Sequence, residues 1–337
     1  MLSFKSASLW LGRIKTKKQE KTSLMNILRH FEDVPAAQRG GVYALGNFDG
    51  VHLGHQQVIK SAQKLAAEMN APMGLLVFEP HPLQFFFPDR SFFRLTSFRS
   101  KAMVLQSLGV DILAALPFDS SMAERQPADF VMDVLVNGLQ ATHIVVGYDF
   151  RFGKGRAGDT TVLQYMGEME GFGVTVVDEV TDGKETYSST RIRELLAEGD
   201  ARGAAKLLGR PWSIETQVIK GDQRGRTIGF PTANLSLAGH VEPAYGVYAV
   251  KATIEDGEFA GDYLGVANLG KRPTFDKKDV LLEVHIFDFD GDIYGAHIKA
   301  SLIEFIRPER KFDGLDSLKA QISIDSEKAK RILAQES

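Results

Sequence analysis

The most constraining feature of the sequence is a stretch rich in glycine and histidine at residues 46–56, GNFDGVHLGHQ. It follows the apolar run Val42–Leu45, which is typical of a short buried strand. After it, apolar residues recur from Val58 to Met69 at the spacing of one helical face. The sequence therefore predicts a strand, a turn and a helix in succession. Glycines allow a backbone to approach a ligand closely, and a helix N-terminus favours an anion such as phosphate.

Two histidines, His52 and His55, lie at the mouth of this predicted helix. Their imidazoles could donate hydrogen bonds to phosphate oxygens. The alternative is a tight turn with two surface histidines, and a strand–glycine–helix junction alone does not separate the two interpretations. A zinc site would need at least a third ligand, and the chain has no cysteine. The stretch therefore favours an anion site over a metal site.

Length and composition limit the class of protein. The 337 residues favour two domains, and 44% apolar with 25% charged residues is typical of a soluble globular protein. A formal net charge of −3 provides no basic field for nucleic acid, and no apolar run approaches the roughly 20 residues of a membrane span. The absence of cysteine excludes a disulfide scaffold and thiol catalysis, and it fits a reducing cytoplasm.

The first 24 residues differ from the rest, because lysine and arginine greatly outnumber acidic residues there. We expect residues 1–24 to be a basic, disordered tail, and Met25 could be the natural start. A transit peptide is the alternative.

Continuous apolar runs alternate with helical patterns through the first half of the chain. The runs predict buried strands of a parallel sheet with helices on both faces. In such sheets ligands bind outside the carboxyl ends of the strands. The turn at 46–56, the loop Glu79–Pro82 and the loop Tyr148–Arg156 all follow predicted strands, so we expect them to converge. The strands are expected at 42–45, 73–78, 112–116, 144–147 and 174–177, and two of the helices at 101–108 and 127–139.

Five phenylalanines follow the second of these loops without a helical or strand period. They form either a hydrophobic plug under the loop or an aromatic wall for a planar ligand. They are Phe85, Phe86, Phe87, Phe92 and Phe93.

Three hydroxyl residues and two arginines open a further predicted helix, Ser188–Arg193, which extends to Gly199. Serine and threonine at this place suit a helix N-cap. The alternative is a positive site for a triphosphate, since Thr190 and Arg193 share one face of the first turn.

The pattern changes after Arg210 to short alternating runs separated by glycines. Such runs predict an antiparallel barrel or sandwich, followed by helices at 315–322 and 326–333. We therefore expect two tightly joined domains, at 25–205 and 206–337. The strands are expected at 214–219, 247–254, 263–269, 280–287 and 298–306.

A second glycine-rich stretch lies at Gly221–Asn234. It is not a P-loop, because the lysine and Ser/Thr ending is missing. Thr232 and Asn234 offer two neutral oxygens at i and i+2, which suits Mg²⁺, an ion that also takes oxygens from water and phosphates. The alternative is a turn with capping side chains.

Glu283 interrupts an apolar strand and is the other polar candidate in this half. If its face lines the barrel, burial raises the pKa of its carboxyl, as a general base requires. If its face is solvated, Glu283 is an ordinary outward residue.

These motifs occur together in one order. His-x-Gly-His directly after Asn-Phe-Asp-Gly resembles the phosphate-binding signature of the nucleotidylyltransferase superfamily, in the form of prokaryotic FAD synthetases. From about Gly41 to Asp325 the chain resembles the prokaryotic bifunctional riboflavin kinase/FAD synthetase family. The further segments that carry this resemblance are Val146–Gly153 with Gly158 and Asp159, Ser188–Arg193, Gly225–Asn234, Gly265–Phe275 and Leu282–Gly295.

The resemblance implies a fold and two activities. The fold would be an α/β nucleotidylyltransferase domain with a Rossmann-like parallel sheet, followed by an antiparallel β-barrel riboflavin kinase domain with C-terminal helices. The barrel would transfer the γ-phosphoryl group of ATP to riboflavin, giving FMN. The N-terminal domain would transfer AMP from ATP to FMN, giving FAD and pyrophosphate. Mg²⁺ would serve both sites of this cytoplasmic enzyme, without a nucleic-acid or membrane partner, and a weak homo-oligomer stays open.

For the first domain, the resemblance implies that His52 and His55 hold ATP phosphates. Arg193, with Ser189 and Thr190, would clamp the leaving pyrophosphate. The FMN phosphate needs no deprotonation, so the domain would mainly align two anions and neutralise developing charge. The nucleotide and Mg²⁺ region would be lined by Asn47 and by Asp149, which stands where some relatives carry asparagine. Further nucleotide contacts are expected at Gly46, Phe48, Asp49 and Gly54.

For the barrel, the resemblance implies that Glu283 accepts the proton of the riboflavin hydroxyl, the base role common in phosphoryl transfer. Thr232 and Asn234 would hold Mg²⁺ with ATP. The loop covering the nucleotide would contribute Gly221, Gly225, Arg226, Gly229 and Pro231.

Two other functions compete with this one. An adenylyltransferase for another phosphate ester, with a purely regulatory barrel, would show no kinase turnover with riboflavin. A nucleic-acid protein is the second, since class I aminoacyl-tRNA synthetases also carry His-x-Gly-His. The acidic balance, the short chain and the lack of a lysine-rich second signature oppose it, and tRNA binding with a steep salt dependence would support it.

Overall fold

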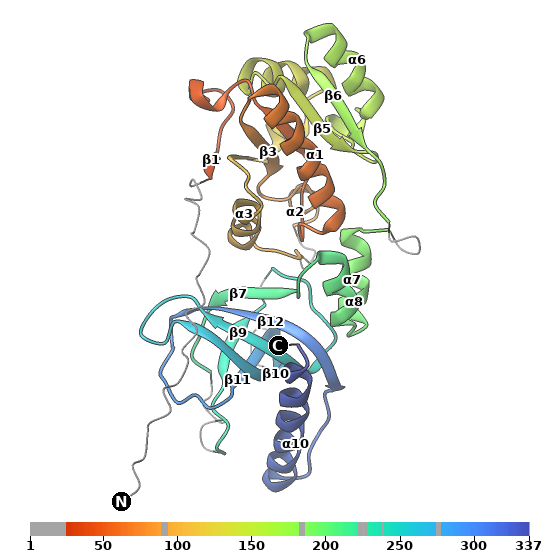
Figure 1. Ribbon diagram of the computed structural model, residues 1–337. Helices are drawn as coiled ribbons and strands as arrows, with labels where there is room; N and C mark the ends of the chain where they lie inside the picture. Colours follow the sequence, from red (N-terminus) through yellow and green to blue (C-terminus); the bar gives the residue numbers. More distant parts are fainter. Residues whose placement is uncertain are drawn as a thin grey trace, which may run out of the picture.

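The structure is a computed structural model that describes residues 25–88, 94–181, 186–221, 225, 228–237, 239–273 and 278–336. The predicted tail at 1–24 therefore lies outside the described residues, as do Phe92, Phe93 and Arg226. Figure 1 shows a helix-covered sheet at one end of the molecule and a curved antiparallel sheet at the other.

Six parallel strands form the N-terminal sheet, in the order β1-β4-β3-β2-β5-β6. Strands β2 to β5 are almost continuously buried, because both faces of the sheet are covered. The parallel sheet confirms the prediction, although the apolar runs do not predict the three-residue β1. The strands are β1 (Asn26–Leu28), β2 (Val42–Leu45), β3 (Met73–Phe78), β4 (Ile112–Leu116), β5 (His143–Gly147) and β6 (Gly173–Val177).

The strand order reverses beside β2, which pairs with β3 on one side and with β5 on the other. This is the topological switch point of the sheet, where open α/β folds bind their ligands. The loops that follow β2, β3 and β5 start from neighbouring strands at one edge. The three loops therefore begin at one edge of the sheet, as the prediction of their convergence requires.

Helices cover both faces of this sheet. On one face α1 (Leu53–Met69) and α3 (Phe98–Ser107) pack through Ile59 and Leu105 against the strands. On the other face lie the π-helix η2 (Phe130–Gly138) and α6 (Thr160–Glu170). The helix predicted at 127–139 is present as α5 (Pro127–Asp129) continued by η2. Shorter helices are η1 (Ala36–Gln38), α2 (Pro82–Phe86), α4 (Ser120–Ala123) and η3 (Lys154–Arg156).

Six strands form the C-terminal sheet, in the order β7-β12-β9-β10-β11-β8, with antiparallel neighbours throughout. A bridge between Ile219 and Asn234 brings its two edges together, so the sheet is nearly closed into a barrel, as predicted. The last two residues of the glycine-rich stretch, Ala233 and Asn234, begin β8, a strand that the sequence does not predict. The strands are β7 (Ser213–Gln217), β8 (Ala233–Ser236), β9 (Gly246–Ile254), β10 (Gly261–Pro273), β11 (Lys278–Ile286) and β12 (His297–Pro308).

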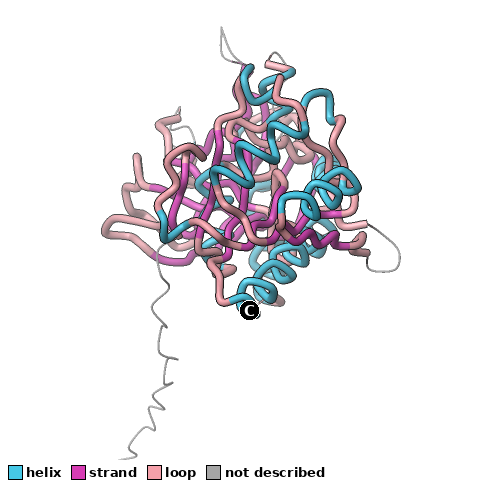
Figure 2. Tube along the Cα trace, turned by 90° about the horizontal axis from the view of Figure 1, so that it is seen from above, coloured by secondary structure: helices cyan, strands magenta, loops and turns pink. Residues whose placement is uncertain are grey.

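One long helix, α10 (Leu315–Ala334), packs on the outside of the barrel. The prediction of two separate helices, at 315–322 and 326–333, is wrong. The polar residues between them do not end the helix, because the buried Asp325 accepts a hydrogen bond from Arg307 Nη2 at 2.7 Å. Seen from above, helices lie mainly at the top and the lower right of the molecule, and strands and loops form its left side (Figure 2).

Two helices lie between the sheets in Figure 1, α7 (Ser189–Ala197) and α8 (Ala201–Leu208). Leu195 of α7 and Leu207 of α8 pack in the same buried cluster as Ile214 of β7. The apolar core of the barrel therefore continues into these helices without a break.

Candidate active sites

The turn after β2 has a backbone shape that most residues avoid. Phe48 and Val51 adopt left-handed conformations, with φ of 49° and 44°. Non-glycine residues in this region persist where the surrounding structure holds them. Gly50, between them, has φ of 82°, which glycine adopts without strain.

The carbonyl groups of this turn accept hydrogen bonds from distant elements. Lys101 Nζ, on α3, donates to Asn47 O at 2.8 Å, and Ser189 Oγ, on α7, donates to Asp49 O at 2.8 Å. Arg210 Nη2 donates to Gly50 O at 2.7 Å. Three elements far apart in sequence therefore fix the turn from its carbonyl side.

The two histidines stack on each other at the start of α1. Their ring centroids are 3.6 Å apart and the planes are inclined by 21°. His52 is the N-cap of α1, since its Nδ1 accepts a hydrogen bond from His55 N at 3.3 Å. His52 is buried, and His55 Nδ1 is a buried atom without a hydrogen-bond partner in the described part of the chain.

Burial keeps both imidazoles neutral at physiological pH. Desolvation lowers the pKa of His52 to about 4, against an opposing contribution from Asp49, while Arg193 and Arg210 lower it further. Desolvation lowers the pKa of His55 well below its usual value, and His52 and Lys101 add to this effect. Neutral imidazoles can donate one N–H each, which suits contact with phosphate oxygens.

Asp49 is a buried carboxylate, only 4% exposed. It accepts hydrogen bonds from the backbone N–H groups of Leu95 and Thr96, at 3.0 and 3.2 Å. Its Oδ2 also lies 2.5 Å from Nη2 of Arg193. Its carboxylate is therefore engaged inside the protein and holds Arg193 beside the histidines.

The three hydroxyl residues at the start of α7 make different contacts. Ser188 is the predicted N-cap, accepting a hydrogen bond from Arg191 N at 3.1 Å. Ser189 donates to the turn after β2, while Thr190 is exposed. The structure thus places this helix start against the His52–His55 turn, as the triphosphate interpretation requires.

Gly46, Asn47 and Asp149 lie at the carboxyl ends of the neighbouring strands β2 and β5. The side chains of Asn47 and Asp149 are exposed. They are available to a ligand at the switch point. Gly54 lies in the first turn of α1, against the ring of His52.

Two buried residues of this site were not among the predicted functional residues. Lys101 is 5% exposed, and desolvation lowers the pKa of its ammonium group, opposed by Asp49 and Glu79. His81 is 8% exposed, and desolvation lowers its pKa to about 4. His81 lies in a loop that the sequence did single out. Lys101 has no sequence signal, because a lysine in an amphipathic helix usually points to water.

The phenylalanines of the loop after β3 are partly packed and partly exposed. Phe85 packs edge-to-face against Phe118, with ring centroids 5.5 Å apart. Phe86 and Phe87 are 54% and 50% exposed. Phe86 also packs edge-to-face against Phe85 and Phe118, with ring centroids 5.3 and 5.7 Å apart. The packed plug is therefore observed, and the aromatic wall for a planar ligand stays a prediction.

Polar residues also gather on the outer face of the barrel. Glu283 of β11 pairs with Asn234 of β8 and with Asn268 of β10. Paired residues on antiparallel strands point to the same face, with Cβ atoms roughly 5 Å apart. Leu282 and Val284 belong to the barrel core, so Glu283 lies on the opposite face and is partly exposed. Of the two predicted orientations, the outward one is observed, and the one that would bury Glu283 inside the barrel is wrong. A base role for Glu283 therefore cannot rest on burial and stays a prediction.

The glycine-rich loop lies directly against these residues. A Cβ at Gly221 would come within 2.6 Å of Asn234 Nδ2, so only glycine allows this approach. Gly225 lies 3.4 Å from Thr232 Oγ1 by the same measure. Pro231 O lies 2.8 Å from Nδ1 of His285.

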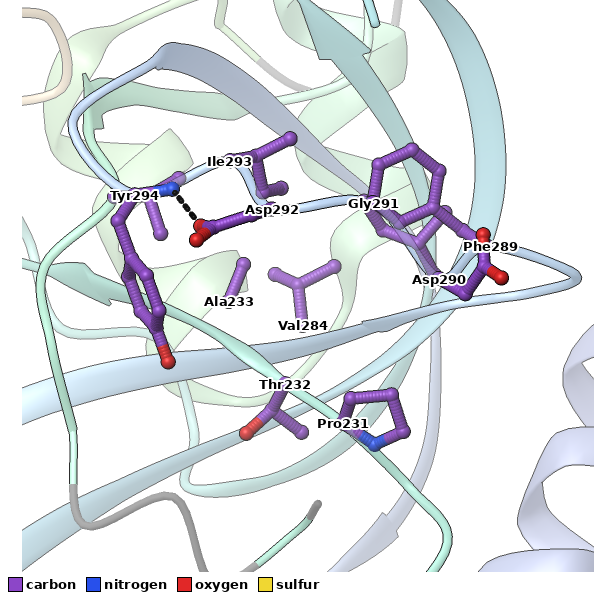
Figure 3. A pocket seen from close by; sticks show the side chains of 12 residues that line it. Pro231, Thr232, Ala233, Val284, Phe289, Asp290, Gly291, Asp292, Ile293 and Tyr294 are labelled. Atoms are coloured by element: carbon purple, nitrogen blue, oxygen red, sulfur yellow. Dashed lines mark hydrogen bonds between the residues drawn. The ribbon is translucent and has the colours of Figure 1, made fainter.

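Two cavities lie next to these polar residues and the glycine-rich loop. The first, of about 260 Å³, lies between the start of β8, strand β11 and the segment 289–294 (Figure 3). Thr232 lines it, and its apolar wall includes Val284, Ile293 and Tyr294. The second, of about 200 Å³, lies between Phe230, β11 and α10. It is lined by Phe230, His285, Phe287, Asp288, Ser323, Ser326, Glu327 and Lys330.

These features define a class of protein. A parallel α/β domain with two stacked histidines and an arginine paired with a buried carboxylate at its switch point is joined to an antiparallel barrel with a second group of polar residues. This combination is that of a two-domain, nucleotide-dependent transferase.

Comparison with known proteins identifies the family. The FAD synthetase family model matches residues 34–191, and the riboflavin kinase family model matches residues 208–333. The bifunctional riboflavin kinase/FMN adenylyltransferase of Haemophilus influenzae is 41% identical over 306 residues, which cover 91% of this chain and 98% of that protein. The enzymes of the same description from Escherichia coli K12 and Bacillus subtilis are also 41% identical, over 302 and 300 residues, covering 89% and 87% of this chain and 96% and 93% of those proteins. The chain belongs to the bifunctional riboflavin kinase/FMN adenylyltransferase family.

A solved structure has a similar fold over most of the chain. The crystal structure of a macrolide-efflux protein from Streptococcus pneumoniae has 32% sequence identity and a TM-score of 0.81, covering 91% of this chain and 99% of that one. The likeness therefore includes both sheets. Within the described ranges, no helix has the length and apolar character needed to cross a bilayer.

Proposed function

We propose that the protein makes FAD from riboflavin in two steps, each using ATP. Residues 206–337 phosphorylate riboflavin to FMN, and residues 25–205 transfer AMP from ATP to FMN, releasing pyrophosphate. The observation that carries the N-terminal assignment is the meeting of His52, His55 and Arg193 at the switch point of the sheet. All three side chains can contact phosphate oxygens.

The N-terminal site stabilises charge that moves between phosphates. FMN already carries an ionised phosphate, so no base is needed. The neutral imidazoles and the N-terminus of α1 donate to the triphosphate, and Arg193, fixed by Asp49, meets the pyrophosphate as it leaves. A guanidinium that a buried carboxylate already holds in place loses little entropy when it binds a phosphate.

The exposed rings of Phe86 and Phe87 supply a place for the flavin of FMN. A planar ring system stacks on aromatic side chains at the rim of a polar site. This location leaves the FMN phosphate directed toward the turn after β2.

In the barrel, the first cavity takes the nucleotide and the second takes riboflavin. Glu283 shares its face of β11 with His285, and His285 lines the second cavity together with Phe287, which directly follows the strand. Its carboxylate is thus on the side of the acceptor hydroxyl and accepts its proton during phosphoryl transfer. Thr232 lines the first cavity, so the phosphates of a nucleotide bound there would lie close to Thr232 and to the acceptor hydroxyl.

The residues present fit Mg²⁺ at Thr232 and Asn234. Among the described residues no cluster of three histidine or acidic side chains could hold a metal ion, so this ion would rest on neutral oxygens and phosphates. The close approach of Gly221 and Gly225 leaves a cradle that side chains would fill. When bound, Mg²⁺ neutralises phosphate charge.

We also propose a cytoplasmic location and small-molecule substrates only, because the reaction consumes ATP and the chain has no cysteine and a net charge of −3.

The test is an incubation of the full chain with riboflavin, ATP and Mg²⁺, with products separated by chromatography. FMN and FAD should both appear. FAD made from added FMN without phosphorylation of riboflavin would instead support a monofunctional adenylyltransferase, and absence of both products would refute the proposal.

A further inference from the structure

Arg210 lies in the part of the chain that matches the riboflavin kinase model, yet it contacts the N-terminal site. Its Nη2 donates to Gly50 O at 2.7 Å and its Nη1 donates to Val51 O at 3.2 Å. These two carbonyls immediately precede His52, the N-cap of α1. The guanidinium of Arg210 therefore binds the turn at the two residues that precede His52.

The chain around Arg210 is fitted closely to the start of α1. Gly209 ends α8 with a φ of 73°, and a Cβ there would lie 2.7 Å from Leu53 Cδ2. Gln56 Nε2 donates both to Val51 O and to Leu208 O, at 3.0 and 3.2 Å. The segment 208–210 thus runs along the first turn of α1.

A second contact fixes the same segment two residues further on. Trp212 Nε1 donates to Leu95 O at 2.9 Å, and Leu95 N donates to Asp49. Arg210 and Trp212 therefore reach the turn after β2 from two directions, one directly and one through Leu95.

We propose that Arg210, a residue of the kinase domain, is a positioning residue for adenylyl transfer. It does not touch ATP. It holds the left-handed turn at Gly50 and Val51, so that His52 and His55 keep their places against the phosphates. The proposal rests on the proposed function of the N-terminal site.

Two physical effects combine at Arg210. The paired N–H groups fix geometry, because Val51 is in a left-handed conformation that needs outside support. The positive charge acts on His52, which also faces Asp49, Arg193 and its stacked neighbour His55. The two cations that lower the pKa of His52 are Arg193, on α7, and Arg210, which follows α8.

The experiment compares three full-length variants, Arg210→Gln, Arg210→Lys and Arg202→Gln. Arg202 is the matched control, since it lies on α8 and pairs with Glu304 of the barrel at 2.7 Å but not with the turn. Riboflavin phosphorylation in the same samples reports that the chain is folded.

We expect Arg210→Gln to lower kcat for FMN adenylylation by about 10- to 100-fold, since misplacement of about 1 Å has an effect of that order. The KM for FMN should not change. Arg202→Gln should behave as wild type. Arg210→Lys keeps the charge but loses the planar pair of donors, so its kcat should lie between the two.

A titration separates positioning from a general loss of structure. The His52 resonance can be assigned among the eight histidines by its loss in His52→Asn. In Arg210→Gln the pKa of His52 should rise, because a cation that repels the imidazolium is gone, and in Arg210→Lys it should stay low. Equal kcat and equal His52 pKa in Arg210→Gln and Arg202→Gln would overturn the proposal while FAD formation stands. A wild-type chain that makes no FAD would overturn the proposed function itself.

Discussion

Asp49→Asn removes one buried charge with almost no change in volume. Asp49 is 4% exposed and accepts backbone hydrogen bonds from Leu95 and Thr96 as well as the ion pair with Arg193. Asparagine keeps one carbonyl oxygen for these donors. Its NH₂ group must then face one of three N–H donors, which leaves at least one of them without an acceptor.

The magnitude follows from the burial of the pair. Removing one partner of a buried ion pair costs about 3–5 kcal/mol. The Arg193 side chain is 20% exposed, so water can partly solvate it after the change, and we expect about 3 kcal/mol. Arg193 then leaves its place beside His52. Loss of one well-placed charged donor lowers kcat by about 100-fold or more, so FMN adenylylation should fall by that factor.

The assay uses the full chain in a Trp10→Phe background, in which Trp212 is the only remaining tryptophan. Trp212 donates to the carbonyl of Leu95, next to the contact with Asp49, so its fluorescence reports unfolding at this place. A double-mutant cycle with Arg193→Gln should give a coupling energy of about 2 kcal/mol or more. Glu194→Gln, on the same helix, breaks only the solvent-exposed pair with Arg191 and should change stability by less than about 0.5 kcal/mol.

A coupling energy below about 0.5 kcal/mol, with FAD formation within about twofold of wild type, would refute this reasoning. Asp49 would then not be what holds Arg193 in place.

Further outcomes follow from the two sites. Glu283→Gln should lower riboflavin phosphorylation about 10²–10⁴-fold while FMN adenylylation continues, and His55→Ala should do the reverse, both measured by chromatography of products. The pKa of His52 is about 4 in the fold against an ordinary 6.5, so its contribution to stability is present above pH 6.5 and is lost as pH falls toward 4. In urea unfolding, wild type should therefore lose about 2 kcal/mol more than His52→Asn between pH 7 and pH 5, and equal losses would contradict the burial of the ring. Gly221→Ala, which displaces Asn234, should raise the Mg²⁺ concentration needed for kinase turnover and leave FAD formation unchanged.

The sequence predicts what repeats along the chain or is local to one turn. The strand–turn–helix at 46–56, the N-cap at Ser188 and the change from parallel to antiparallel strands all depend on neighbouring residues, so patterns find them. Strand β8 is not predicted, because the strand has only four residues and follows a segment with glycine and proline. The continuity of helix α10 is not predicted, because Asp325 pairs with Arg307, which lies on a different segment of the chain.

The rest of the N-terminal site depends on such distant contacts. Lys101 and Arg210 look like ordinary solvated charges in sequence, yet both are turned toward carbonyls of one turn. Asp49 lies within the recognised motif, but only the fold shows that its partners are the 95–96 backbone and Arg193. For Glu283, the strand pattern cannot give the face, because it alternates equally well in either orientation until the barrel closes.

Leu95 connects the two domains, because its carbonyl accepts a hydrogen bond from Trp212 and its amide donates one to Asp49. This connection limits how the domains of two such enzymes can be combined. A chimera cut between residues 205 and 206 would join one parent's Leu95 and Gly50 to the other parent's Trp212 and Arg210. We therefore expect that the N-terminal and barrel domains cannot be exchanged freely between enzymes. A fusion that retains adenylylation should carry the 94–96 segment and the 208–212 segment from the same parent.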